Sequence, residues 1–222
     1  MTFISTKNLI KKYAGDEDGF PAVNDVTMDI EQGEFVAVMG RSGSGKSTLL
    51  SVLGALNTPT SGLCTVDSID IYALGHDQQA DFRREYLGFV FQNFHLLPYL
   101  TALENVMVPL AVTRFSYGEK KDMAMKALAQ VNLEKKARQL PSMMSGGEQE
   151  RVAIARAVVN HPRIILADEP TGNLDSKTGQ EVMELLSKLN QQGITVVMVT
   201  HSRENSSFAG RVLTMTDGKL SG

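Results

Sequence analysis

The sequence predicts an α/β fold: a mostly parallel sheet core, an N-terminal antiparallel β layer and an inserted helical subdomain. Short apolar runs at 35–39, 164–167 and 194–199 alternate with segments of helical periodicity, as buried parallel strands and their crossover helices do. Within 22–30, apolar and polar residues alternate, which indicates a half-exposed antiparallel strand. From about 93 to 158, strand patterns give way to helical ones.

The composition is that of an ordinary soluble globular protein. The chain has 222 residues, 42% hydrophobic and 21% charged, enough for one large domain or two small ones. Its net charge of −3, with basic residues spread along the chain, argues against a general nucleic-acid binder. The single cysteine, Cys64, cannot form an internal disulfide, and no run approaches 18 apolar residues, so we expect no membrane span.

The N-terminal third is predicted to be β-rich. Val26, Met28 and Ile30 alternate with polar neighbours, and 14–22 is rich in turn-forming residues. The expected elements are strands at 3–13, 22–30, 63–66 and 69–71, a short polar helix around 78–86, and a strand at 88–91.

Residues 40–48, GRSGSGKST, fit the phosphate-binding pattern G-x-x-x-x-G-K-[ST]. An apolar strand precedes the loop and an amphipathic helix follows it, so backbone N–H groups would surround a phosphate at a helix N-terminus. Lys46 would reach the β- and γ-phosphates, and the Ser47 hydroxyl would coordinate Mg²⁺. The nucleotide-binding residues expected here are Gly40, Arg41, Ser42, Gly43, Ser44, Gly45, Lys46, Ser47 and Thr48.

The helix after this loop is predicted from a stripe of apolar residues. Leu49, Val52, Leu53 and Leu56 recur at i, i+3, i+4 and i+7, the spacing of one helix face. Farther along, two more stripes predict helices, and Asp217-Gly218 predicts a hairpin turn within 211–220. The two stripes are Ala124, Ala127, Leu128 and Val131, and Val182, Leu185, Leu186 and Leu189.

Two carboxylates follow the apolar run 164–167. Asp168 and Glu169 would lie beyond the carboxyl end of a strand, where open α/β sheets bind their ligands. Asp168 would sit near the Mg²⁺ held by Ser47, through water, and Glu169 would orient or deprotonate an attacking water. A helix cap is the structural alternative for such a pair.

Residues 144–149 (MSGGEQ) and 150–157 (ERVAIARA) resemble the signature motif of the ATP-binding-cassette (ABC) ATPases, and the motif order resembles that family along nearly the whole chain. The resemblance implies a RecA-like P-loop fold, ATP and Mg²⁺ as cofactors, and ATP hydrolysis. It also implies a head-to-tail homodimer, in which Ser145, Gly146, Gly147 and Glu148 face the partner's phosphate loop. Met144 and Glu148 depart mildly from the commonest form of the motif.

Other positions match the family one at a time. Tyr13 matches the aromatic residue that stacks on adenine, although it is also a plain strand-end tyrosine. Gln92 resembles the glutamine that reaches Mg²⁺ and the attacking water, and Asp175 lies in a loop resembling the one that crosses to the other subunit. His201 matches the histidine that contacts the γ-phosphate. We treat His76, His95 and His161 as surface or packing residues.

Residues 91–97, 101–106 and 167–175 are similar to the lipoprotein-release and macrolide-export group. The resemblance implies a single nucleotide-binding domain (1–222), with 1–92 and 159–222 as core and 93–158 as helical insert. It implies a separate integral membrane permease, docking near Phe94–Leu100 unless that cluster packs between lobes, and a peripheral place on the cytoplasmic face of the inner or plasma membrane. The alternative is an ATPase that signals to a membrane partner controlling cell-wall hydrolysis.

Rival classes share only parts of the pattern. A P-loop kinase or GTPase would need residues 40–48 but not Ser145–Gly147, and no Asn-Lys-x-Asp guanine motif occurs. Soluble ABC proteins of DNA repair or translation carry a long coiled-coil insertion or two cassettes, which this sequence lacks.

Overall fold

The computed structural model describes residues 2–13 and 21–221, and its strands form two sheets. The smaller sheet is antiparallel, in the order β2-β1-β4-β5, which confirms the predicted N-terminal layer. Most of the predicted loop 14–22 falls on residues 14–20, outside the described residues. The strands are β1 (Thr2–Lys11), β2 (Val23–Glu31), β4 (Ser61–Val66) and β5 (Ile69–Asp70).

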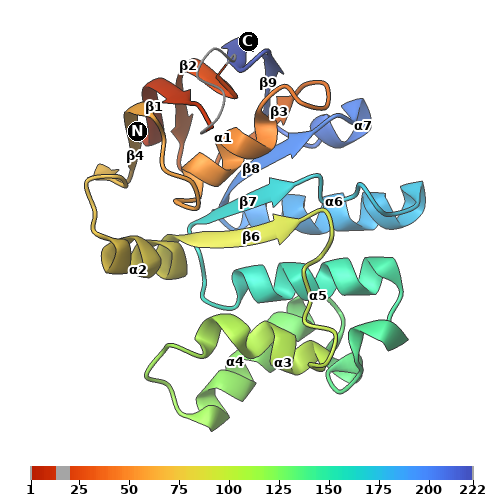
Figure 1. Cartoon of the computed structure of the whole chain (residues 1–222). Coiled ribbons are helices and arrows are strands. Elements are labelled where there is room, and N and C mark those ends of the chain that lie inside the picture. The colour runs from red at the N-terminus through yellow and green to blue at the C-terminus, as the bar shows by residue number, and fades with distance from the viewer. Residues whose placement is uncertain (1, 14–20, 222) are drawn as a thin grey trace.

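The larger sheet has the order β10-β9-β3-β8-β7-β6, and all its neighbours are parallel except β9 and β10 (Figure 1). This confirms the mostly parallel core. The hairpin β9–β10 turns at Asp217 and Gly218, whose φ angles of 47° and 78° suit a tight hairpin turn. The strands are β3 (Phe35–Met39), β6 (Leu87–Phe91), β7 (Ile164–Asp168), β8 (Thr195–Thr200), β9 (Arg211–Thr216) and β10 (Lys219–Ser221).

Helix α1 (Lys46–Leu53) is shorter than the apolar stripe predicts. The helix ends at Gly54, and Ala55 takes a left-handed φ of 52°, so Leu56 leaves the helix. Leu56 is 53% exposed, and the prediction that it extends the buried stripe is wrong. Other helices outside the segment 93–158 are α2 (His76–Tyr86), α6 (Ser176–Gln191) and the short α7 (Arg203–Ser206).

Between β6 and β7 the chain forms helices and turns without a strand, as its periodicity predicts. They lie below the larger sheet in Figure 1, with α5 next to β6. Serine or threonine capping boxes start three of the helices, α3, α4 and α5. The elements are α3 (Ala102–Met107), η1 (Val108–Leu110), α4 (Tyr117–Gln130), η2 (Glu134–Lys136), η3 (Pro141–Met143) and α5 (Gly146–Val158).

Two hydrophobic cores cover opposite faces of the larger sheet. Along β3, Val36 and Val38 face the core shared with α1 and the antiparallel sheet. Phe35 and Ala37 face the core shared with α3, α4, α5 and α6. The helices of 93–158 thus pack into the same core as the sheet. Both cores leave the carboxyl edge of the parallel strands open for a site.

Candidate active site

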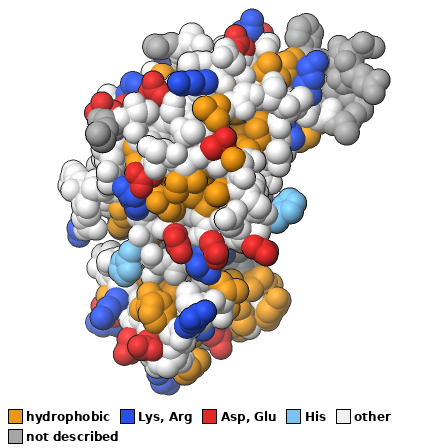
Figure 2. Space-filling view, turned by 90° about the vertical axis from the view of Figure 1, so that its left-hand side faces the viewer, with side chains coloured by type: hydrophobic (Ala, Val, Ile, Leu, Met, Phe, Trp, Pro, Cys, Tyr) orange, Lys and Arg blue, Asp and Glu red, His pale blue; other side chains and the backbone are white. Residues whose placement is uncertain are grey.

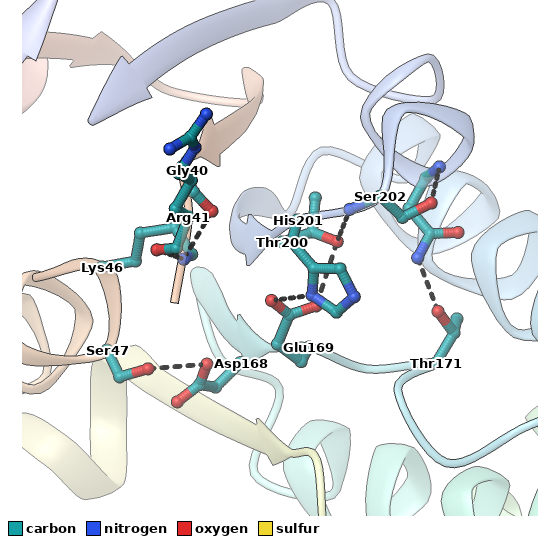
Figure 3. A network of polar contacts seen from close by, with 11 residues as sticks. Gly40, Arg41, Lys46, Ser47, Asp168, Glu169, Thr171, Thr200, His201 and Ser202 are labelled. Carbon is teal, nitrogen blue, oxygen red and sulfur yellow. Dashed lines mark hydrogen bonds and ion pairs between the residues drawn. The ribbon is translucent and has the colours of Figure 1, made fainter. Parts of the chain in front are cut away.

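A cavity of about 610 Å³ lies at the carboxyl ends of β3, β6, β7 and β8, where an open α/β sheet binds ligands. It brings together most of the predicted site residues, which come from distant parts of the chain. Figure 3 shows several of them converging. The lining residues are Ala22, Arg41, Ser42, Gly43, Gly45, Lys46, Ser47, Thr48, Gln92, Asp168, Glu169 and His201.

The loop before α1 is shaped by close backbone approaches. Gly45 has a φ of 100°, and a Cβ there would lie 1.9 Å from the carbonyl oxygen of Ala22. A Cβ on Gly40 would lie 2.3 Å from the carbonyl oxygen of Met215. Both positions therefore exclude a side chain, and the glycines let the loop turn directly into the helix. Ala22 lines the cavity without any signal in the sequence, because only the fold brings it beside the loop.

Lys46 is the first residue of α1, and its side chain extends back across the loop. Its side chain is buried, and Nζ donates hydrogen bonds to the carbonyl oxygens of Gly40 (2.8 Å) and Arg41 (2.9 Å). The N–H groups of the first helical turn have no acceptor within the helix. A buried ammonium and several unsatisfied N–H groups at one helix N-terminus attract an anion such as a phosphate.

Ser47 and Asp168 meet on one side of the cavity. The Ser47 hydroxyl donates to Oδ1 of Asp168 over 3.1 Å (Figure 3). Burial raises the pKa of Asp168 above its ordinary value, while the bond from Ser47 lowers it. A hydroxyl and a carboxylate oxygen are the hard donors that Mg²⁺ prefers, and Mg²⁺ usually takes its other ligands from phosphates and water. The donor set therefore fits a magnesium–nucleotide complex.

Glu169 is held by the last residue of β8, Thr200, and by His201, which follows it. Its Oε1 lies 2.8 Å from Nδ1 of His201, and its Oε2 accepts a hydrogen bond from the Thr200 hydroxyl over 3.1 Å. The backbone of Glu169 takes a left-handed φ of 48° as the chain turns away from β7. The carboxylate is mostly shielded, whereas the imidazole is exposed. The hydrogen bond from Thr200 to Glu169 was not predicted from the sequence.

Gln92 follows β6 directly and lines the cavity. Its backbone carbonyl accepts a hydrogen bond from the Asn173 side chain over 2.8 Å. The same amide donates to Oδ1 of Asn93 over 3.0 Å. Asn173 thus fixes the start of the segment after β6, a contact that the sequence pattern did not indicate.

Three residues of the predicted nucleotide site lie outside the cavity lining. The Tyr13 hydroxyl lies 3.2 Å from the Thr48 hydroxyl and accepts a hydrogen bond from the Asn57 amide, so the ring is tied to α1 and its following turn. Gly40 and Ser44 belong to the loop but stand behind its cavity face, and the Ser44 side chain is buried.

The predicted signature residues also lie away from this cavity, at the start of α5. Ser145 is the N-cap: its Oγ accepts the N–H of Glu148 at 3.3 Å, and Glu148 accepts the N–H of Ser145 at 3.1 Å. A hydrogen bond from Lys136 lowers the pKa of Glu148. Gly146 and Gly147 form the first turn, so the motif is also a capping box.

Asp175 is likewise an N-cap residue, at the start of α6. Its carboxylate accepts hydrogen bonds from the N–H and the hydroxyl of Thr178, at 3.1 Å and 2.6 Å, and these bonds lower its pKa. It lines a second cavity, of about 190 Å³, that also contacts Glu169 and His201.

The chain matches the family described as ABC transporter over residues 23–172, more than half of its length. It belongs to the ABC transporter family. Curated relatives of this ABC cassette include the ATP-binding protein MJ0796 of Methanocaldococcus jannaschii, 47% identical over 98% of this chain and 94% of that protein. The macrolide export ATP-binding/permease protein MacB of Vibrio parahaemolyticus is 42% identical over 98% of this chain, but only over 33% of MacB.

Solved structures agree with this membership. The dimeric structure of MJ0796, described as a bacterial ABC transporter cassette, matches with a TM-score of 0.90 at 46% identity, over 99% of this chain and 97% of that one. A dimeric post-hydrolysis state of MJ0796 bound to ADP and Pi matches with the same TM-score at 45% identity, over the same shares of the two chains.

The ABC cassette described here is an ATPase that uses ATP and Mg²⁺. Family membership and the full-length likeness to a post-hydrolysis cassette support this activity. The cavity agrees with it, since it combines an anion-binding loop, oxygen donors for Mg²⁺ and a fixed carboxylate. Within residues 2–13 and 21–221, no helix is long and apolar enough to span a bilayer.

Proposed function

We propose that this ABC cassette forms a homodimer around two ATP and drives a separate membrane permease of the lipoprotein-release and macrolide-export type. The observation that carries the proposal is the Glu169 carboxylate, held by Thr200 and His201 in the cavity that contains Lys46. The likeness to MacB, whose cassette and permease are one protein, supports the transporter type.

In the proposed reaction, Glu169 accepts a proton from the water that attacks the γ-phosphorus. The bond between this phosphorus and the β–γ bridging oxygen breaks, and ADP and phosphate leave. His201 keeps the carboxylate oriented and contacts the γ-phosphate, while Lys46 and the loop N–H groups neutralise the phosphates. Ser47, Gln92 and, through water, Asp168 would hold Mg²⁺, which supplies further charge neutralisation.

The position of the α5 N-terminus supports the proposed dimer. Ser145, Gly146 and Gly147 offer a second anion-binding helix end, outside the cavity formed by the phosphate loop of the same chain. In the proposal this end contacts the γ-phosphate bound by the partner's loop, Tyr13 stacks on adenine, and Asp175 communicates across the interface. The dimeric solved relatives support this arrangement.

The permease is proposed to dock in a groove of about 390 Å³ between α2, β6 and the helical segment. Of the predicted docking region Phe94–Leu100, His95 lines the groove, whereas Leu96 packs against the helical core. Figure 2 views the side of the molecule that carries α2 and shows hydrophobic side chains exposed among charged ones. The groove lining is Leu56, Arg83, Arg84, Leu87, Gly88, Phe89, Phe91, His95, Pro109, Val112, Arg156, Ala157 and Asn160.

An apolar groove with cationic side chains suits an amphipathic helix that carries an acidic residue. Arg83 donates a hydrogen bond to the Ala55 carbonyl, which leaves its other donors for a partner. Docking there would keep the cassette at the cytoplasmic face of the membrane as a peripheral subunit.

Glu169→Gln tests the proposal, because glutamine keeps the shape of the side chain but cannot accept the proton. We expect ATP binding to persist, hydrolysis to fall at least ~10²-fold, and an ATP-bound dimer to accumulate in size-exclusion chromatography with light scattering. Glu184→Gln, on the exposed face of α6, is the matched control and should behave as wild type. Hydrolysis at a near wild-type rate by Glu169→Gln would remove Glu169 from its catalytic role.

A further inference from the structure

Arg156, near the end of α5, joins this helix to the segment that follows β6. Its Nη1 donates a hydrogen bond to the His95 carbonyl over 2.5 Å, and its Nη2 donates to the Phe94 carbonyl over 2.7 Å. One planar guanidinium thus holds two consecutive carbonyls, each through a different nitrogen of its rigid fork.

The backbone that Arg156 holds is unusual. Phe94 and His95 both take left-handed φ angles, 59° and 48°. Two successive left-handed residues form a short helical turn, and the carbonyls of such a turn point the same way, so both reach one cation. Side-chain-bearing residues rarely adopt this conformation, and it persists where neighbouring contacts fix it. The two bonds from Arg156 are such contacts.

The segment 92–95 is therefore fixed at both ends. Asn173 holds the Gln92 carbonyl at its start, and Arg156 holds Phe94 and His95 at its end. Gln92, which lines the cavity, is the first residue of this fixed segment. Arg156 thus holds the backbone two and three residues after Gln92.

A buried carboxyl group on the same helix, that of Glu150, interacts with the charge of Arg156. Glu150 is fully buried, and neither of its carboxylate oxygens has a hydrogen-bond partner among the described residues. Burial raises the pKa of Glu150, and the charge of Arg156 lowers it; burial lowers the pKa of Arg156, and Glu150 raises it. Because burial raises the pKa of Glu150 to about 8, its carboxyl group favours the charged guanidinium only above that pH, once it has lost its proton.

We propose that Arg156 is a positioning residue for ATP hydrolysis, which fixes the backbone just after Gln92 and so orients Gln92 toward Mg²⁺ and the attacking water. The inference rests on the proposed role of Gln92. Arg156 also lines the groove assigned to the permease, so a partner that draws the guanidinium toward itself acts on the same segment. This one side chain joins the signature helix and the groove to the segment that begins at Gln92.

The test compares Arg156→Ala and Arg156→Lys in the full chain, with Arg114→Ala, an exposed arginine of the same helical segment, as control. We expect Arg156→Ala to lower kcat for ATP hydrolysis about 10-fold with KM for ATP changed less than about 2-fold, since misplacement affects the reaction more than binding. Amide exchange in residues 93–97 should rise about 10-fold, while β7 and β8 keep their protection. The kcat of Arg156→Lys should lie between those of wild type and Arg156→Ala. The control Arg114→Ala should match wild type in both measurements.

Unchanged kcat and unchanged exchange in Arg156→Ala would overturn the inference, and so would a rise in KM alone. If the alanine variant does not fold, Arg156→Lys decides: a lowered kcat with protected β7 and β8 supports positioning, and a wild-type kcat refutes it. Glu169→Gln separates the two proposals. If it abolishes hydrolysis while Arg156→Ala has no effect, only the positioning role fails.

Discussion

Nδ1 of His201 lies 2.8 Å from Oε1 of Glu169, although the two residues are 32 positions apart in the chain. The register of β7 and β8 explains this contact, because Asp168 pairs with Val199 at the carboxyl ends of adjacent parallel strands. The residues that follow these positions leave the sheet at the same edge. Thr200 completes the arrangement by donating to Oε2, so that both carboxylate oxygens are engaged.

His201→Ala should therefore free one oxygen of Glu169 and lower kcat. We expect a loss of ~10²-fold or more, typical of removing a residue that orients a catalytic base, with a smaller change in KM for ATP. Steady-state ATPase measurements check this. His76→Ala, at the exposed start of α2, is the matched control. If the kcat of His201→Ala stayed within about 2-fold of wild type, the imidazole would have no part in the reaction.

Gly45→Ala should destroy the phosphate-binding loop through a backbone clash. The new Cβ would lie 1.9 Å from the Ala22 carbonyl oxygen, so the loop or the chain at Ala22 must move. We expect ATP affinity to fall more than ~10-fold, measured by fluorescent-nucleotide binding. Gly193→Ala separates this clash from plain backbone strain: Gly193 has nearly the same φ, 98° against 100°, but open space around its Cβ position. Equal losses of affinity in the two variants would contradict the argument.

The sequence predicted the elements and residues whose signals are local. The apolar runs of β3, β7 and β8 mark buried strands, and the carboxylates after β7 follow from where a strand ends. The S-x-x-E pattern at Ser145 and Glu148 also carried a local capping signal, which the resemblance to a nucleotide-contacting motif concealed.

The remaining features depend on tertiary contacts. The close approach of Ala22 to the loop, and the hold of Arg156 on Phe94 and His95, join segments distant in sequence, and no spacing rule encodes them. Leu56 fits the helical period, yet the helix ends first, at Gly54, and Ala55 takes a left-handed φ of 52°. A periodic pattern does not show where the chain must turn.

Asn105 gives a prediction about the segment that carries Leu97. This fully buried amide accepts the Leu97 N–H at 2.7 Å and donates to the carbonyls of Leu97, Leu100 and Thr101. Asn105→Ala should leave these buried backbone groups without partners and lower the free energy of unfolding by about 2–4 kcal/mol. Urea unfolding measures this. Gln130→Ala, at the exposed end of α4, should change stability by less than about 0.5 kcal/mol, and an equally small effect at Asn105 would show that solvent replaces the lost bonds.

Glu150 gives a pH-dependent prediction about stability. Burial raises its pKa from an ordinary 4.5 to about 8 in the folded chain, against the opposing charge of Arg156. Between these values the unfolded chain has released the proton that the folded chain still holds. Stability therefore falls as pH rises through this window, by at most about 5 kcal/mol, since one pKa unit corresponds to ~1.4 kcal/mol.

Glu150→Gln removes this titration while keeping the shape of the side chain. We expect the variant to match wild type at pH 5 and to exceed its free energy of unfolding by about 1–3 kcal/mol at pH 8, in urea titrations at both pH values. For Glu184→Gln, on the exposed face of α6, the free energy of unfolding should change between pH 5 and pH 8 as it does in wild type. Parallel curves for Glu150→Gln would mean that the folded chain releases the proton as readily as the unfolded one. The buried carboxyl group would then be charged at neutral pH, and the attraction of Arg156 would be what offsets the cost of burying it.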